Sequence, residues 1–329
     1  MKTIIKIIAS LVLIAAICVC ASITGAVILN SPPEDMPKQT FFKVDKGDTA
    51  REIGQNLEED KLIKSSKFFL VYVKLKKTSA QMKTGLYKID YGQSMVGIHD
   101  ILIQGSEELF NVTIPPGHTS REIAKILEEK EIVNAEDFVE AVKLQHAEGF
   151  LFPDTYNFPK GYPAEKVVKY MTENFHNYVK SIYSDYDKLE QETIKEKVVL
   201  ASIVEREYRV AEEAPIIAST FYNRIEHNMY LGSCATVVYI ITEVQGKAHP
   251  ERLFYRDLEV ESPYNTYKHK GLPPGPICNP GRIAINASFN PAETDYLYFL
   301  LEDPDTGQHK FSKNWAEHNK SYNLYIKGR

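Results

Sequence analysis

The stretch V-V-L-A-S-I-V-E-R-E-Y-R, residues Val198 to Arg209, begins with seven uncharged residues, and Glu205 and Glu207 follow them. A helix that is apolar nearly all round is buried, and a carboxyl group where it emerges can lie in the wall of a cleft. Partial burial raises a carboxyl pKa, which suits a general acid. The alternative, that both glutamates are solvated, stays open, and nothing local prefers one of them. Helical spacing predicts two adjoining faces: Val198, Ala201, Ser202 and Glu205 on one, Leu200, Ile203, Val204 and Glu207 on the other.

Length and composition indicate a folded chain of two or three domains. The 329 residues are 43% hydrophobic and 25% charged, which is ordinary for globular proteins. A net charge of -5, without a basic patch interleaved with aromatic residues, gives no support for nucleic acid as a partner. The nine His form no H-E-x-x-H motif, and no Cys/His set has zinc spacing, so neither a metal nor a cofactor is expected.

The N-terminus has the pattern of a membrane segment. Ile7 to Leu29 carries no charge and would span about 34 Å as a helix, enough to cross a bilayer. Lys2 and Lys6 precede it, so the positive-inside rule predicts a cytoplasmic N-terminus and an extracytoplasmic remainder. A cleaved signal peptide is the alternative. The expected divisions are residues 1–30 for the cytoplasmic tip and transmembrane helix, and 31–40 for a linker.

An internal repeat follows the linker. Gly47–Ile53, G-D-T-A-R-E-I, matches Gly117–Ile123, G-H-T-S-R-E-I, at a spacing of 70 residues. Each copy predicts a short strand, a turn with Gly, and a helix capped by Thr or Ser. This plan resembles the small LysM-type peptidoglycan-binding unit, although the repeat could serve packing alone. Residues 41–145 are therefore expected to form a LysM-like α/β region.

Residues 146–329 predict a mixed α+β domain, so the fold class is α+β. Its Pro- and Gly-rich stretch, Gly271–Gly281, cannot be regular structure and is expected to be an ordered loop within the domain. Periodicity predicts helices over Val167–Tyr183, from Pro215 onward and over Ala284–Phe289, and a strand over Asp295–Leu300.

An ordered series of motifs resembles one family. E-G-F-L-F-P-D-T-Y, A-S-I-V-E-x-E, F-Y-N-R, A-T-V-x-Y, Y-N-T-Y and G-L-P-P-G-P-I-x-N-P-G occur in that order, and Y-L-Y-F and H-x-F-S follow. They resemble the YceG-like endolytic murein transglycosylases (MltG) over about residues 40 to 325. The resemblance implies a lytic transglycosylase that cleaves the β-1,4 bond between N-acetylmuramic acid and N-acetylglucosamine in nascent peptidoglycan strands. It also implies termination of strand growth near peptidoglycan synthases.

The resemblance makes Glu205, the first Glu of A-S-I-V-E, the catalytic residue and gives Glu207 a supporting role. A lytic transglycosylase uses the sugar's own C6 hydroxyl in place of water, so one carboxyl group can act first as acid and then as base. Its pKa should then be raised towards neutrality. Candidates to hold the N-acetyl and hydroxyl groups of the substrate are Asn223, Ser233, Thr236, Asn265 and Tyr267.

Asn223 and Asn265 could instead satisfy loop backbone. The sequence also departs from the family pattern. Where relatives commonly carry L-Q-[ST]-D-[AP]-T-V, this chain has L-G-S-C-A-T-V, so Gly232 and Cys234 replace Gln and Asp. If those side chains touch sugar in relatives, the sugar contacts differ here. Cys278 lies in the proline-rich loop, and two cysteines in motifs near the expected cleft predict a Cys234–Cys278 disulfide, with free buried thiols as the alternative.

Three functions remain to be distinguished at this point. The first is a membrane-anchored lytic transglycosylase with a catalytic domain at residues 146–329. The second is a non-catalytic peptidoglycan-binding scaffold for cell-wall synthases. The third is a hydrolase that admits water.

Overall fold

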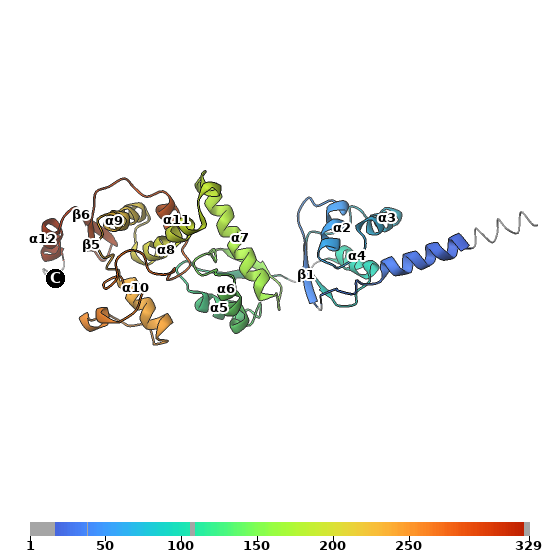
Figure 1. Ribbon diagram of the computed structural model, residues 1–329, viewed down its shortest axis with the longest axis horizontal. Helices are drawn as coiled ribbons and strands as arrows, with labels where there is room; N and C mark the ends of the chain where they lie inside the picture. Colours follow the sequence, from blue (N-terminus) through green and yellow to red (C-terminus); the bar gives the residue numbers. More distant parts are fainter. Residues whose placement is uncertain (1–16, 38, 106–108, 326–329) are drawn as a thin grey trace, which may run out of the picture. The chain divides into compact units, whose positions relative to one another are not determined.

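The computed structural model describes residues 17–37, 39–105 and 109–325, which divide into two compact units at Leu109/Phe110 (Figure 1). The N-terminal residues 17–30 are helical. Within the described part of the chain, no helix combines the length and apolar character needed to cross a membrane, and residues 7–16 of the predicted span lie outside it.

The first unit contains one copy of the repeat. Its strands β1 and β2 pair antiparallel, with Phe42 opposite Tyr87. The helices cover this ribbon and bury Leu57, Phe69 and Ile98 against it. Such a ribbon is marginal alone, so packing of the helices stabilises it. The elements are β1 (Gln39–Val44), α2 (Ala50–Glu59), α3 (Ser66–Lys76), β2 (Gly85–Asp90) and α4 (Met95–Gln104).

The second repeat copy opens the second unit with the same order of elements. Its strands also pair antiparallel, with Val112 opposite Tyr156. The predicted repeat region, residues 41–145, is thus shared between the two units, and the second copy ends on a strand beyond residue 145. The elements are β3 (Phe110–Thr113), α5 (Ser120–Glu129), α6 (Ala135–Leu144) and β4 (Thr155–Phe158).

Identical capping explains why both copies start a helix at the same point. Thr49 and Thr119 each accept a hydrogen bond from the backbone of a glutamate three residues on. In return, the backbone N–H groups of these two threonines donate to the carboxylates of Glu52 and Glu122, which completes a capping box. The predicted strand and capped helix of each copy are confirmed.

The rest of the second unit is built around the helix that contains the A-S-I-V-E motif, α8 (Gln191–Glu207). Figure 1 shows it among α7, α9 and α11. The proline-rich loop precedes α11, and a short two-stranded ribbon ends the unit with α12. The elements are α7 (Ala164–Ile182), α9 (Ala214–Glu226), α10 (Cys234–Tyr239), α11 (Arg282–Phe289), β5 (Tyr298–Asp303), β6 (Gln308–Ser312), α12 (Trp315–Tyr325), the 3-10 turns η1 (Tyr186–Lys188), η2 (Ala211–Glu213) and η4 (Tyr255–Glu259), and the π-helical turn η3 (Ile240–Val244).

Two apolar cores meet on α8, as its sequence predicts. Val198 and Ala201 pack with Phe175 of α7 and Phe289 of α11. Burying a Val or Phe side chain stabilises a fold by about 1.5–3 kcal/mol, so these contacts anchor α8. The adjoining face of α8 packs against α9 and α11 through Leu200, Ile203 and Val204.

Candidate active site

The C-terminal half of α8 is fixed by a serine inside its apolar run. Ser202 is fully buried. Its hydroxyl donates to the Val199 carbonyl at 2.7 Å and accepts the Ile277 backbone N–H at 3.0 Å. A buried hydroxyl needs such partners. Ser202 therefore joins the helix to the Gly271–Gly281 loop, which is ordered within the unit as predicted.

Glu205 lies where α8 meets that loop. Its Oε2 accepts the backbone N–H of Gly281 at 2.8 Å. Gly117, in the turn before α5, is so close that a Cβ there would lie 3.7 Å from Glu205 Cγ. Burial raises the pKa of Glu205 to about 7, against the lowering effects of the Gly281 N–H and the Arg206 guanidinium. The carboxyl group can thus hold or release a proton near neutral pH.

Glu207 lies two residues further along α8, about half a helical turn away, in a different environment. Its carboxylate accepts a hydrogen bond from Ser233, the residue that precedes α10. Burial raises its pKa too, and the Ser233 hydroxyl and the Arg224 guanidinium oppose that rise. Glu207 therefore links the end of α8 to the start of α10.

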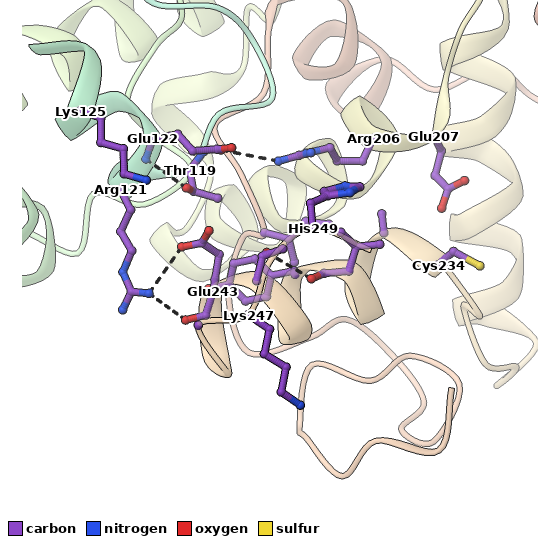
Figure 2. Close-up of a pocket in the computed structure, with 16 residues that line it drawn as sticks. Thr119, Arg121, Glu122, Lys125, Arg206, Glu207, Cys234, Glu243, Lys247 and His249 are labelled. Carbon is purple, nitrogen blue, oxygen red and sulfur yellow. Dashed lines mark hydrogen bonds and ion pairs between the residues drawn. The ribbon is translucent and has the colours of Figure 1, made fainter. Parts of the chain in front are cut away.

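A cavity of about 580 Å³ opens beside these residues, between α5, the end of α8 and α10 with η3 (Figure 2). Arg121 reaches across from α5 and donates to the Glu243 carbonyl at 2.9 Å. Arg206 lies 3.9 Å from Glu122 on the other side. The second repeat copy is thus one wall of the cavity.

Two further cavities adjoin the first one. A cavity of about 320 Å³ shares Arg206, Glu207 and Cys234 with it, and extends towards Arg224 and β5. A cavity of about 440 Å³ shares Thr119, Arg121, Tyr239 and Glu243 with the first one, and extends to the proline-rich loop. Each of the two thus shares lining residues with the first cavity, and the three together are called the groove below. Glu205 does not line them, but it directly precedes Arg206 and Glu207, which do.

Most of the side chains predicted to bind the sugar form hydrogen bonds within the protein instead. Asn223 donates both amide hydrogens to the Thr294 and Tyr296 carbonyls. Asn265 is fully buried and donates to the Leu258 and Val260 carbonyls. These two asparagines support loop backbone, the alternative that the sequence left open.

The other three candidates lie around the start of α10. Thr236 is fully buried and donates to the Ser233 carbonyl at 2.8 Å, and Ser233 donates its hydroxyl to Glu207. Tyr267 is half-buried, with its hydroxyl 3.0 Å from Cys234 Sγ. The structure therefore brings Glu207, Ser233, Cys234 and Tyr267 together, with Thr236 behind them.

The predicted Cys234–Cys278 disulfide is wrong, because both thiols are free. Cys278 is buried and donates to the Ser202 carbonyl at 3.3 Å, on the core side of the loop. Cys234 is exposed and contacts Tyr267. The two side chains point to different partners, which sequence position could not reveal. Among the described residues, no group of His, Cys, Asp or Glu could hold a metal ion.

Three contributors to the site escaped prediction: Asn279, Glu148 and Ser202. Asn279 is fully buried in the proline-rich loop, and its amide donates to Glu148 at 2.9 Å. Of these three residues, only Ser202 could have been noticed in the sequence. It is a hydroxyl within an otherwise apolar run, and a buried hydroxyl needs a hydrogen-bond partner. The partners of Asn279 lie 128 to 161 residues earlier, so no local pattern indicates them.

Comparisons with known proteins agree on one family. The YceG-like family matches residues 42–323. The endolytic murein transglycosylase of Bacillus subtilis (strain 168) is 31% identical over 336 residues, covering 94% of this chain and 91% of the relative. That of Streptococcus pneumoniae serotype 2 (strain D39) is 27% identical over 333 residues, covering 89% and 59%. A crystal structure of a YceG-like protein from Listeria monocytogenes aligns with a TM-score of 0.53 and 29% identity, over 86% of this chain and 98% of that one.

Proposed function

Because the chain belongs to the YceG-like family, we propose that it is an endolytic peptidoglycan lytic transglycosylase, the activity for which its relatives from Bacillus and Streptococcus are named. The observation that carries this proposal is Glu205. It is a partly buried carboxyl group with a pKa of about 7, held by one backbone N–H beside a groove.

Glu205 serves as acid and then as base. The protonated carboxyl group gives its proton to the oxygen of the β-1,4 bond, and the bond from C1 of N-acetylmuramic acid to that oxygen breaks. The C6 hydroxyl of the same sugar then attacks C1, and the Glu205 carboxylate takes the hydroxyl proton. The products are a free 4-hydroxyl end and a 1,6-anhydro end, and no water is consumed.

The groove suits cleavage within a strand. Its three adjoining cavities extend from β5, past the end of α8, to the proline-rich loop. A polymer can lie along such a groove with sugars on both sides of the reacting bond, whereas a closed pocket accepts only a chain end. The walls mix acidic, basic and aromatic side chains that can hydrogen-bond or stack on sugars.

The deciding experiment is mass spectrometry of uncrosslinked nascent glycan after digestion. We expect anhydro ends from the wild type and loss of about 10³-fold or more of the rate in Glu205→Gln, because the amide cannot donate a proton as an acid. Glu207→Gln is the matched comparison on the same helix, and it should retain more activity. Products heavier by one water would favour the hydrolase, and no products from the wild type would favour the scaffold.

We propose an extracytoplasmic location at the inner membrane, with the uncharged stretch Ile7–Leu29 as the anchor and peptidoglycan synthases as neighbours. The hydropathy of that stretch and the two preceding lysines support this. The full chain should resist carbonate extraction from membranes, and external protease should digest it in spheroplasts. Recovery in the soluble fraction would contradict the anchor. Crosslinking in intact cells tests the synthase contact.

We also propose that the first unit binds glycan as a LysM-like module. Its strand–helix–helix–strand order and antiparallel ribbon support this. The full-length Glu205→Gln variant should co-sediment with purified peptidoglycan, and substitutions on the first unit should weaken that binding without changing the fold of the second.

A further inference from the structure

Asn279 is a buried amide whose hydrogen-bonding capacity is completely used. Its Oδ1 accepts the backbone N–H groups of Gly149 at 2.8 Å and Leu151 at 2.9 Å. Its Nδ2 donates to the His118 carbonyl at 3.0 Å and to Glu148 Oε1 at 2.9 Å. An asparagine amide offers two donors and two acceptor sites. None is left for a substrate, and the residue has no exposed surface.

The backbone of Asn279 is joined to the turn before α5. Its N–H donates to the His118 carbonyl at 2.8 Å, and its carbonyl accepts the Gly117 N–H at 2.9 Å. That turn lies next to the Glu205 side chain, since a Cβ at Gly117 would lie 3.7 Å from Glu205 Cγ and 4.0 Å from its Oε1. The turn and the loop are therefore held together at the point where they meet Glu205.

Gly281, two residues after Asn279, completes the contact. Its N–H is the group that donates to Glu205 Oε2. A Cβ at Gly281 would lie 2.8 Å from Pro116 Cβ, so the loop and the turn approach too closely for any side chain. The position of this N–H therefore depends on how the loop is fixed to the turn.

Glu148 extends the same network to the repeat helix. Its carboxylate accepts the Ser120 N–H, at the first turn of α5, at 3.1 Å and 3.3 Å. Asn279 supplies a further hydrogen bond to it. Burial raises the pKa of Glu148. This buried carboxyl–amide pair thus adds a side-chain link between α5 and the loop to the backbone bonds of the turn.

On the basis of the proposed function, we infer that Asn279 is a positioning residue for Glu205. It fixes the Gly117–His118 turn to the loop and so aims the Gly281 N–H at the catalytic carboxyl group, without touching the sugar. The inference predicts that Asn279 controls the rate of the chemical step and the proton affinity of Glu205 more than the binding of glycan.

The effect on proton affinity has a definite sign. The Gly281 N–H stabilises the ionised form of Glu205, so its displacement should raise the pKa of that group further. The substitution itself removes none of the other titratable or charged groups around Glu205. They are Arg206 on α8, Tyr208 directly after it, Cys278 in the loop, His118 in the turn and, through Arg206, Glu122 on α5.

The test uses the full chain, uncrosslinked glycan and a series of pH values. Asn279→Ala removes four hydrogen bonds without adding charge. We expect kcat to fall about tenfold or more with KM within about twofold, and the pH limb assigned to Glu205 to move upward. The control is Ser219→Ala, which removes a buried hydroxyl contact with Thr294 at 2.8 Å and should change only stability.

A swapped pair keeps the inference testable if Asn279→Ala does not fold. In Asn279→Asp a carboxylate oxygen replaces the donor that faces Glu148, and two acceptors then oppose each other. Glu148→Gln in addition restores one donor between the two positions, so the double variant should be several-fold more active than Asn279→Asp.

The inference is overturned if the double variant is no more active than Asn279→Asp. It is also overturned if Asn279→Ala loses only as much stability as Ser219→Ala, with kcat and the pH limb unchanged. Failure of the proposed function is a separate result: the wild type would form no anhydro ends, or Glu205→Gln would keep its turnover.

Discussion

A carboxyl group with a pKa of about 7 lowers the stability of the protein that contains it. Glu205 has an ordinary pKa near 4.5 when unfolded, so between those two values the folded state binds more protons than the unfolded state. Stability must therefore fall as pH rises through this window, and the full loss is present above it. In the proposed mechanism, the proton that Glu205 holds near neutral pH serves catalysis, and holding it is also what costs stability.

Glu205→Gln should consequently stabilise the protein at pH 8 by about 1–3 kcal/mol, and by much less near pH 4.5. The amide oxygen can still accept the Gly281 N–H, so no hydrogen bond is lost. Chemical denaturation of both proteins at the two pH values measures this difference. An equal effect at both would mean that the carboxyl group titrates normally.

Gly281→Ala should reduce turnover about tenfold or more, because the added Cβ would lie 2.8 Å from Pro116 and 3.5 Å from Glu205 Oε2. Either the N–H or the carboxylate has to move. Initial rates on nascent glycan, compared with the melting temperature, separate the local effect from unfolding. A variant with normal rates would show that the close approach is not needed for catalysis.

At the scale of single elements, the paired capping boxes allow a direct comparison. Thr49→Ala and Thr119→Ala remove the same cap and should each cost about 1 kcal/mol of local stability. Only Thr119 lines the groove, so only Thr119→Ala should also lower kcat. Hydrogen exchange in α2 and α5, with kinetics on glycan, tests both. Equal kinetic effects would contradict this assignment.

Local elements were predictable where neighbouring residues determine them. The G-x-T-x-R-E-I pattern contains both the cap and its return partner, three residues apart, so each repeat helix was predicted correctly. The α8 run predicted its two buried faces. The family resemblance, rather than spacing, distinguished Glu205 from Glu207, and its catalytic role is still a prediction.

Contacts between distant segments were not predictable in this way. The strand that closes the second repeat copy, β4, begins 42 residues after its partner residue Thr113. Asn279 bonds to residues near positions 118 and 149, and Cys278 turns towards Ser202 instead of Cys234. These contacts depend on which side of the loop faces the core, and a single sequence does not indicate that.

At the scale of the second unit, the groove should determine where a strand is cut. Thr242 lines its central cavity, and its hydroxyl donates to the Val238 carbonyl one turn back. An indole ring at this position would fill part of a space of about 580 Å³ through which the glycan passes in the proposed function. Thr242→Trp should therefore slow cleavage of long strands about fivefold or more, with less effect on short oligosaccharides that need only part of the groove.

Thr172→Trp is the matched control, because Thr172 is also a helical threonine with a hydroxyl bonded to its own helix, on α7 and away from the three groove cavities. It should leave both rates unchanged. Chain-length profiles of the products, measured by chromatography for the two variants and the wild type, give the result. If Thr242→Trp cuts long strands as fast and with the same length profile as Thr172→Trp, the glycan does not follow this groove, and the substrate must reach Glu205 by another route.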